Sequence, residues 1–405
     1  NTLCDLSMRF TVTACAAALI CGGSFAADDE PTIPFIDLRG WNGLLADRYS
    51  RVETAKEWRE ALESVGFAAI TNHGLPRPVR DALASSAKKF FNQSKEEKLA
   101  CSTSQRYGGG GYTAMGQEAV TRTLSAGESP PPADLVESFV FLPATIAAAP
   151  SVASKDYTVA ELEAMSDEEL DAIDAADESE PGGAPKELLE DARVYWKHME
   201  NLVQVLHGLS AHALGVWPNV LEDLYQPAPA YALRLAHYPP IQNEQTCADG
   251  HAAGSAGDSA SAKPGECEMA AEGRMRYGAH TDYQGLTVLF PDPDQPGLEV
   301  LFPDGKWRSV FEGVAEQNAL VVNIGDLWQR MTNDKWKSTM HRVVNPESGT
   351  EQAGPGRLSV AFFTGPRDDA MVEVLETCAD ADHPPNYEPI RSGDHLRAKI
   401  EASNL

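Results

Sequence analysis

Two side chains that can bind a metal ion lie two residues apart at His280 and Asp282, just before an apolar run at 286–290. Side chains at positions i and i+2 of a β-strand point to the same face, so the imidazole and the carboxylate can reach one point. His341, 59 residues after Asp282, offers a third ligand. Two histidines and one carboxylate on one face of a metal leave its other positions open, which is typical of non-haem iron(II) sites. Taken alone, the His-x-Asp pattern also fits a core or surface histidine beside a solvated carboxylate.

A second pair with strand spacing, Arg357 and Ser359, begins sixteen residues after His341. An arginine can bind a carboxylate through two charge-assisted hydrogen bonds, and a serine hydroxyl on the same face can add a third. A dicarboxylate such as 2-oxoglutarate needs such a site at its distal end, while its keto acid end chelates the metal. Tyr238 can supply a further hydroxyl. The alternatives are a surface ion pair for Arg357 and a half-buried strand position for Tyr238.

The elements that must position these residues are short β-strands. Runs of β-forming residues separated by turn signals follow Leu221, and they predict an antiparallel double-sheet barrel. Helical spacing of apolar residues occurs before them. We therefore predict a mainly β protein with flanking helices: a double-stranded β-helix (jelly-roll) core with a helical N-terminal region. The expected strands are 33–38, 66–70, 231–238, 286–290, 298–302, 319–324 and 358–364, and the expected helices are 53–64, 78–99 and 187–214.

The charge of the chain argues against some partners. Its formal net charge is −27 at pH 7, whereas phosphate backbones and anionic lipids are bound by Lys and Arg. Neither nucleic acid nor an anionic membrane is therefore expected as a partner. No segment after the N-terminus is apolar enough for a stable membrane span. The seven cysteines form no CxxC pair, which argues against a zinc ribbon or a thioredoxin-like site.

Taken together, the motifs resemble the soluble plant and microbial branch of the 2-oxoglutarate/iron(II) dioxygenase superfamily. This isopenicillin N synthase-like branch includes anthocyanidin synthase and gibberellin oxidases. The resemblance covers most of the chain, and the order and spacing of the HTD, HRV and RLS motifs are highly specific together. The matching segments are IPFIDL (33–38), GFAAITNHG (66–74), FFNQSKEEK (90–98), DLVESF (134–139), HYPP (237–240), GAHTDYQGLTVL (278–289), GLEVL (297–301), VVNIGDLWQRMTND (321–334), HRVVNP (341–346) and RLSVAFF (357–363).

The resemblance implies a set of site residues, with no catalytic residue beyond the metal centre. Many relatives carry an asparagine two residues before the tyrosine, where this chain has Ala236, so one cosubstrate contact of the family is in question. Tyr283 and Phe363 are expected in the substrate pocket, with ordinary packing as their alternative role. The expected iron(II) ligands are His280, Asp282 and His341, and the expected 2-oxoglutarate ligands are Arg357, Ser359 and Tyr238.

The activity implied by the resemblance is that of an oxidoreductase. A non-haem iron dioxygenase of this kind hydroxylates or desaturates a small organic substrate with dioxygen and 2-oxoglutarate, and it releases succinate and CO2. Ascorbate is a further candidate cofactor, and the chain is expected to act as a monomer. Three alternatives stay open: an isopenicillin N synthase-like oxidase that uses no 2-oxoglutarate, a zinc hydrolase with the same three ligands, and a non-catalytic binding barrel.

The chain divides into segments of different composition. Residues 8–27 have the layout of a signal peptide; the protein is expected to be soluble, and it is secretory or organellar rather than cytoplasmic if these residues act as a signal. The expected organisation is a targeting segment (1–30), an N-terminal dioxygenase region (31–142), an acidic insertion (143–186), a long-helix region (187–229), the catalytic jelly roll (230–370) with a surface-loop insertion (242–276), and a C-terminal tail (371–405).

Overall fold

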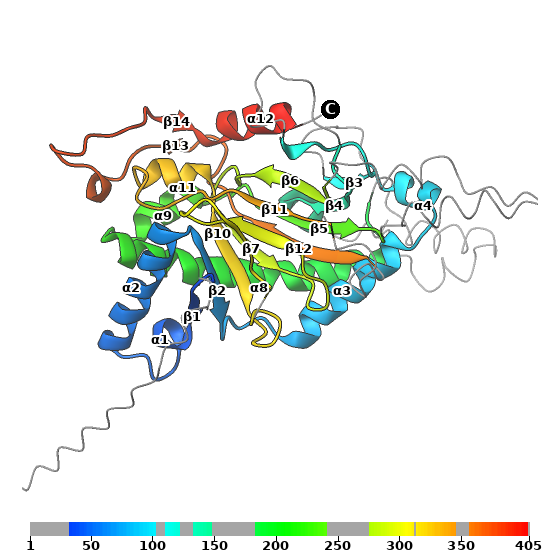
Figure 1. Ribbon diagram of the computed structural model, residues 1–405, viewed down its shortest axis with the longest axis horizontal. Helices are drawn as coiled ribbons and strands as arrows, with labels where there is room; N and C mark the ends of the chain where they lie inside the picture. Colours follow the sequence, from blue (N-terminus) through cyan, green and yellow to red (C-terminus); the bar gives the residue numbers. More distant parts are fainter. Residues whose placement is uncertain are drawn as a thin grey trace, which may run out of the picture. The chain divides into compact units, whose positions relative to one another are not determined.

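Two β-sheets face each other, and helices cover the outer face of the larger sheet (Figure 1). The computed structural model describes residues 32–102, 110–121, 133–147, 183–240, 275–311, 313–345 and 356–403. The expectations for the targeting segment, and for most of the two insertions, lie outside these residues. Of the acidic insertion, the described part contains the short helix α5 (Pro143–Ala147).

The larger sheet draws its strands from both halves of the chain. It is antiparallel except for the parallel pair formed by its first two strands. In spatial order it contains β1 (Phe35–Asp37), β2 (Phe67–Thr71), β10 (Leu320–Ile324), β7 (Leu286–Phe290), β12 (Arg357–Phe363), β5 (Ala232–Tyr238), β4 (Glu137–Phe141) and β3 (Gly111–Thr113). The smaller sheet contains β6 (Tyr277–His280), β11 (His341–Val343), β8 (Leu298–Leu301) and β9 (Trp307–Ser309). A separate pair is formed by β13 (Met371–Val372) and β14 (Ile390–Arg391).

The helices lie mainly before the barrel strands in the chain. The longer ones are α2 (Arg48–Ser64), α3 (Arg77–Phe91), α8 (Lys186–Leu214), α9 (Pro218–Tyr225) and α12 (Ser392–Ser403). The shorter ones are α1 (Arg39–Asn42), α4 (Lys95–Ala100), α11 (Asp326–Met331) and the 3-10 turn Glu376–Cys378. None of the helices in the described part of the chain is both long enough and apolar enough to cross a membrane.

Strands of the larger sheet separate two kinds of side chain. In β12, Leu358, Val360 and Phe362 belong to the apolar core that the helices cover. Because successive side chains point to opposite faces, Arg357 and Ser359 of the same strand face the smaller sheet. A second apolar core, which includes residues of β2, β10 and β8, joins the two sheets beside the polar positions. One face of the sheet therefore holds the fold together, and the other carries the groups that can do chemistry.

Helix α8 supports the apolar face of the larger sheet, behind which it runs in Figure 1. Its thirteen buried residues include Leu202, Leu206 and Leu209, which recur at the spacing of one helix face. Trp58 of α2 is fully buried, and its Nε1 donates a hydrogen bond to Ser210 Oγ of α8 at 3.0 Å. Such a buried bond contributes about 1 kcal/mol, and it joins the first long helix to the central one.

The fold class predicted from the sequence is confirmed, because the two facing sheets and the covering helices form the expected jelly-roll core. The single helix predicted over 78–99 is wrong, since the chain breaks after α3 and restarts as α4. The break is produced by a capping box. Ser94 Oγ accepts the backbone N–H of Glu97, while the Glu97 carboxylate accepts the backbone N–H of Ser94.

The packing of His207 on α8 generates a prediction about acid stability. Its ring lies 4.3 Å from the Tyr225 ring and 5.9 Å from the Trp328 ring, and its Nε2 has no hydrogen-bond partner in the described part of the chain. Burial lowers the pKa of His207 to about 4 from 6.5. As the pH falls, the unfolded chain therefore binds a proton at this histidine near pH 6.5, whereas the folded chain binds it only near pH 4. The stability that the neutral His207 side chain contributes is complete above pH 6.5 and is lost as the pH falls toward 4.

We expect the free energy of unfolding of the wild type to fall more steeply on acidification than that of His207→Phe. Between pH 7 and 5 the difference should be on the order of 1 kcal/mol. Urea unfolding of metal-free protein at the two pH values measures it. Equal losses in the two proteins would show that this imidazole does not titrate as its burial requires.

Candidate functional site

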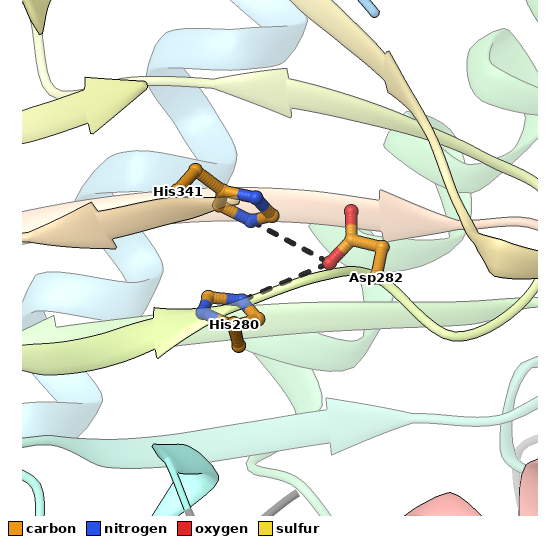
Figure 2. Close-up of side chains that lie close together, drawn as sticks. All are labelled: His280, Asp282 and His341. Carbon is orange, nitrogen blue, oxygen red and sulfur yellow. Dashed lines mark ion pairs between the residues drawn. The ribbon is translucent and has the colours of Figure 1, made fainter. Parts of the chain in front are cut away.

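Three side chains predicted as metal ligands meet at one buried point (Figure 2). The Oδ1 atom of Asp282 lies 3.8 Å from Nε2 of His280 and 3.6 Å from Nε2 of His341. All three ligand atoms lie within 4.8 Å of one another. Since metal bonds to nitrogen and oxygen are about 2 Å long, these separations suit a single ion held by all three side chains.

The register of the smaller sheet brings the two histidines together. Strands β6 and β11 are antiparallel neighbours, and His280 is directly opposite His341. The centroids of the two imidazole rings are 4.1 Å apart. Asp282 lies just after the end of β6, where its backbone carbonyl accepts the N–H of Asp326 at 2.9 Å. Strand pairing therefore places the two histidines side by side, and the turn after β6 places Asp282 next to them. Asp282 and His341 are 59 positions apart in the chain.

Each histidine is oriented by a hydrogen bond from its other ring nitrogen. The Nδ1 atom of His280 is 2.9 Å from the carbonyl of Gly278, and that of His341 is 3.1 Å from the carbonyl of Thr339. A carbonyl can only accept, so Nδ1 carries a proton in both rings, and Nε2 is the nitrogen that faces Asp282. This is the tautomer in which both histidines can bind a metal at the point that they share with Asp282.

The aspartate is oriented in a similar way. Its Oδ2 accepts hydrogen bonds from the Thr287 hydroxyl and, at 2.6 Å, from the Asn323 amide, which leaves Oδ1 facing the histidines. Burial alone would raise the pKa of the Asp282 carboxyl, but His341 and His280 hold it below its usual value. Burial and the neighbouring His341 lower the pKa of His280 to about 3. The groups are thus a carboxylate and a neutral imidazole, which are the forms that bind metals.

Thr287, Asn323 and Asp134 are supporting residues that the sequence analysis missed. Asp134 Oδ1 accepts the N–H of Gly278 at 2.9 Å, and so it fixes the residue whose carbonyl orients His280. Burial raises the pKa of Asp134 to about 6. Strand alternation could have placed Thr287 and Asn323 on the inner face, but their contact with Asp282 depends on how the strands pair across the barrel.

The predicted cosubstrate residues lie together on the inner face of the larger sheet. Arg357 of β12 is paired in register with Tyr238 of β5, and its guanidinium carbon lies 5.3 Å from the centre of that ring. The side chains of Arg357, Ser359 and Tyr238 are all buried, and Arg357 donates a hydrogen bond to Ser359 Oγ. Ala236 is opposite Ser359 in the register, and its methyl group supplies no donor there. A buried cation flanked by two hydroxyl-bearing side chains suits a carboxylate.

Arg276 is placed differently from its predicted position. It is expected at the end of the surface-loop insertion 242–276, yet its side chain is only 1% exposed. Its guanidinium carbon lies 6.0 Å from the ring of Tyr238, on which Arg357 also packs. The prediction of a surface loop is therefore wrong at this residue, because strand β6 begins immediately after it and carries it into the barrel.

A cavity of about 1970 Å³ reaches two of the three predicted metal ligands. His280 and Asp282 form part of its wall, as do Tyr283 and Phe363, the two aromatic residues predicted for the substrate pocket. Beside them, Arg234 pairs with the Glu118 carboxylate at 2.6 Å and donates to the Tyr277 hydroxyl at 2.8 Å. The cavity is larger than the roughly 300–1,000 Å³ that is usual for small-molecule sites.

Helix α12 forms another part of the cavity wall. Leu396, Arg397 and Ile400 line the cavity, although their segment is expected only as a C-terminal tail. The segment carries an ordinary helical sequence, and no local signal shows that it turns back onto the barrel. Its contribution follows from long-range packing, which a single sequence does not display.

Comparison with known proteins gives two family matches. Residues 231–366 match the 2OG-Fe(II) oxygenase superfamily, and residues 33–153 match the family described as non-haem dioxygenase in morphine synthesis N-terminal. The chain is 26% identical over 373 residues to the 2-oxoglutarate-Fe(II) type oxidoreductase hxnY of Emericella nidulans, covering 91% of this chain and 90% of that protein. It is 28% identical over 311 residues to the 2-oxoglutarate-dependent dioxygenase citB of Monascus ruber, covering 75% and 76%.

A solved structure with the same arrangement is that of a full-length protein of Neurospora crassa in complex with alpha-KG. It is similar with a TM-score of 0.67 at 26% identity, over 92% of this chain and 97% of that one. The match therefore includes both the sheets and the helices around them.

The hydrogen bond from Asn323 generates a prediction about metal affinity. Replacing Asn323 by Ala frees one side of the Asp282 carboxylate, so Mn(II) should bind about tenfold more weakly, as for other residues that orient metal ligands. Titration calorimetry with Mn(II) measures this. A matched control is Asn386→Ala, whose exposed amide bonds to Asp334 and which should bind Mn(II) as the wild type does. Wild-type affinity in Asn323→Ala would exclude the orienting role.

Proposed function

The chain belongs to the 2OG-Fe(II) oxygenase superfamily, and from this we propose that His280, Asp282 and His341 are its iron(II) ligands. The protein is a non-haem iron dioxygenase that uses 2-oxoglutarate. The observation that carries the ligand assignment is the meeting of the three ligand atoms within 4.8 Å. Two imidazoles and one carboxylate suit iron(II) and leave the remaining octahedral positions open.

We propose that Arg357, Ser359 and Tyr238 bind the distal carboxylate of 2-oxoglutarate. The proposal is supported by the burial of all three residues and by their position on one face of two paired strands. A guanidinium out of contact with water binds a carboxylate more strongly than an exposed one does, because the surroundings screen the charge less. The asparagine contact that many relatives make is not available at Ala236, so this anchor depends more heavily on the arginine.

When bound, iron(II), 2-oxoglutarate and dioxygen supply the oxidising power: a small organic substrate is hydroxylated or desaturated while 2-oxoglutarate becomes succinate and CO2. The residues of the chain contribute position. Thr287 and Asn323 hold the Asp282 carboxylate, and Arg357 sets how far the keto acid end reaches. The buried walls around these groups keep water away from the reacting atoms.

The cavity beside the metal ligands is proposed as the substrate site. Tyr283 and Phe363 line it together with His280 and Asp282, so a substrate that fills it lies next to the metal position. Aromatic side chains of this kind bind apolar or planar organic groups. We also propose that the protein acts as a monomer and that it has no nucleic-acid partner. The net charge of −27 supports the second of these two proposals.

The alternatives that the sequence left open gain no support. The quoted relatives carry 2-oxoglutarate in their names, and the similar solved structure holds alpha-KG, which argues against an isopenicillin N synthase-like oxidase. No observation favours a zinc hydrolase or a non-catalytic binding barrel.

The metal assignment predicts a measurable side reaction. With iron(II), ascorbate and 2-oxoglutarate, the wild type should release succinate slowly in the absence of substrate and only when dioxygen is present. Asp282→Ala should reduce this release to background, because the remaining two ligands hold iron poorly. Asp304→Ala, which removes an exposed carboxylate paired with Arg308, is the matched control and should behave as wild type. Equal succinate release by Asp282→Ala and wild type would overturn the ligand assignment.

The pocket assignment predicts an effect confined to substrate. In a screen of small organic molecules, an acceptor is recognised because it stimulates succinate release. For such an acceptor, Phe363→Ala should raise KM by about tenfold or more, since a buried phenyl contact is lost. The unstimulated release should stay at the wild-type rate. If KM is unchanged for every acceptor found, Phe363 does not contact substrate.

A further inference from the structure

Arg276 is a buried arginine without a hydrogen-bond partner in the described part of the chain. All three guanidinium nitrogens are shielded from solvent, and none of them donates to any group there. A guanidinium carries five N–H donors, and buried polar groups are almost always satisfied. An arginine whose donors meet no acceptor among the described residues is therefore costly, and these donors are available to a bound ligand.

Arg276 lies immediately before strand β6, and its side chain is buried beside the proposed cosubstrate site. Because the register of β6 against β11 shifts between Tyr277 and His280, the contacts of Arg276 show its direction better than strand alternation does. Its guanidinium carbon is 6.0 Å from the Tyr238 ring centre, and that of Arg357 is 5.3 Å from the same centre. Two arginines from facing sheets thus converge on one tyrosine.

Among the described residues, the charges that act on both arginines do not balance. The carboxylate that acts on both arginines is that of Asp292, which is itself buried. Its two oxygens accept the backbone N–H groups of Leu358 and Asp294, each at 2.9 Å. Burial and the nearby Arg357 lower the pKa of Arg276 to about 10, so it is still a cation at neutral pH. Two guanidinium groups and one carboxylate leave one positive charge uncompensated, which an anion between them would neutralise.

We propose that Arg276 is a second arginine of the cosubstrate site and that it binds the distal carboxylate of 2-oxoglutarate together with Arg357. This inference rests on the proposed function, because it assumes that the cosubstrate extends from the metal ligands toward Arg357. The second arginine supplies donors that Ala236 cannot. It also makes the site selective for a dianion, since a keto acid without the distal carboxylate offers neither guanidinium group an anionic partner.

Ligand truncation separates this role from simple packing. The Mn(II)-loaded full-length protein is titrated calorimetrically with 2-oxoglutarate and with 2-oxopentanoate, which has the same keto acid and chain length but no distal carboxylate. In Arg276→Met, affinity for 2-oxoglutarate should fall by about 10- to 100-fold, the effect of losing a charged hydrogen-bond partner. Affinity for 2-oxopentanoate should not change. Arg276→Lys keeps the charge and should show a smaller loss, again for 2-oxoglutarate alone.

Three controls make each outcome decisive. Arg308→Met removes another buried arginine, one that is paired with Asp304, and should leave both affinities as in the wild type. If Arg276→Met weakens both ligands equally, or neither, the proposal is overturned. If Arg276→Met does not fold, the same comparison in Arg276→Lys decides between these results. Failure of the proposed function is recognised separately, because Arg357→Met would then also bind 2-oxoglutarate as tightly as the wild type.

Discussion

The two-residue alternation of the larger sheet is the constraint on which the rest of the molecule depends. On each inner strand, one set of side chains is apolar and packs under α2, α3 and α8, while the other set faces the smaller sheet. In β12 the two sets are interleaved residue by residue, with Leu358 between Arg357 and Ser359. The helices therefore do more than cover a core, because they hold in register the strand whose opposite face carries the proposed cosubstrate residues. A slip of one residue would exchange the two sets and destroy both packing and site.

Burial gives the site its electrostatic character. Away from water His280 stays neutral, while its neighbours keep Asp282 charged against the effect of burial, so these two proposed metal ligands have the protonation states that bind metals. The same burial makes unpaired charge expensive, and the chain pairs its charges elsewhere. Glu137 of β4, for example, accepts hydrogen bonds from Lys98 at 2.7 Å and from Tyr112 at 2.5 Å. Against that background the guanidinium of Arg276 stands out, because none of its nitrogens has a hydrogen-bond partner among the residues that the structure describes.

Features that depend on neighbouring residues in the chain could be predicted from the sequence, whereas features that depend on contacts between distant segments could not. The jelly-roll class and most strands could be predicted, because period-two patterns and turn signals are local. The metal ligands and Arg357 could be proposed because each sits in a short motif with a characteristic spacing. The break between α3 and α4 was also visible, in the Ser94 and Glu97 pair, but it was outweighed by apolar periodicity. The burial of Arg276 and the return of α12 to the cavity were not visible, since both depend on which distant segments pack together.

The position of α12 in the cavity wall has a consequence for how this scaffold can change over evolutionary time. The residues proposed for iron and cosubstrate lie on, or directly after, strands of the two sheets that form the barrel. Leu396 and Ile400 lie instead near the end of the chain, on a helix that takes part in neither sheet. Mutations there reshape the pocket at small cost to the barrel. Acceptor preference can therefore drift independently of the chemistry, and relatives with the same metal ligands are free to diverge in what they oxidise.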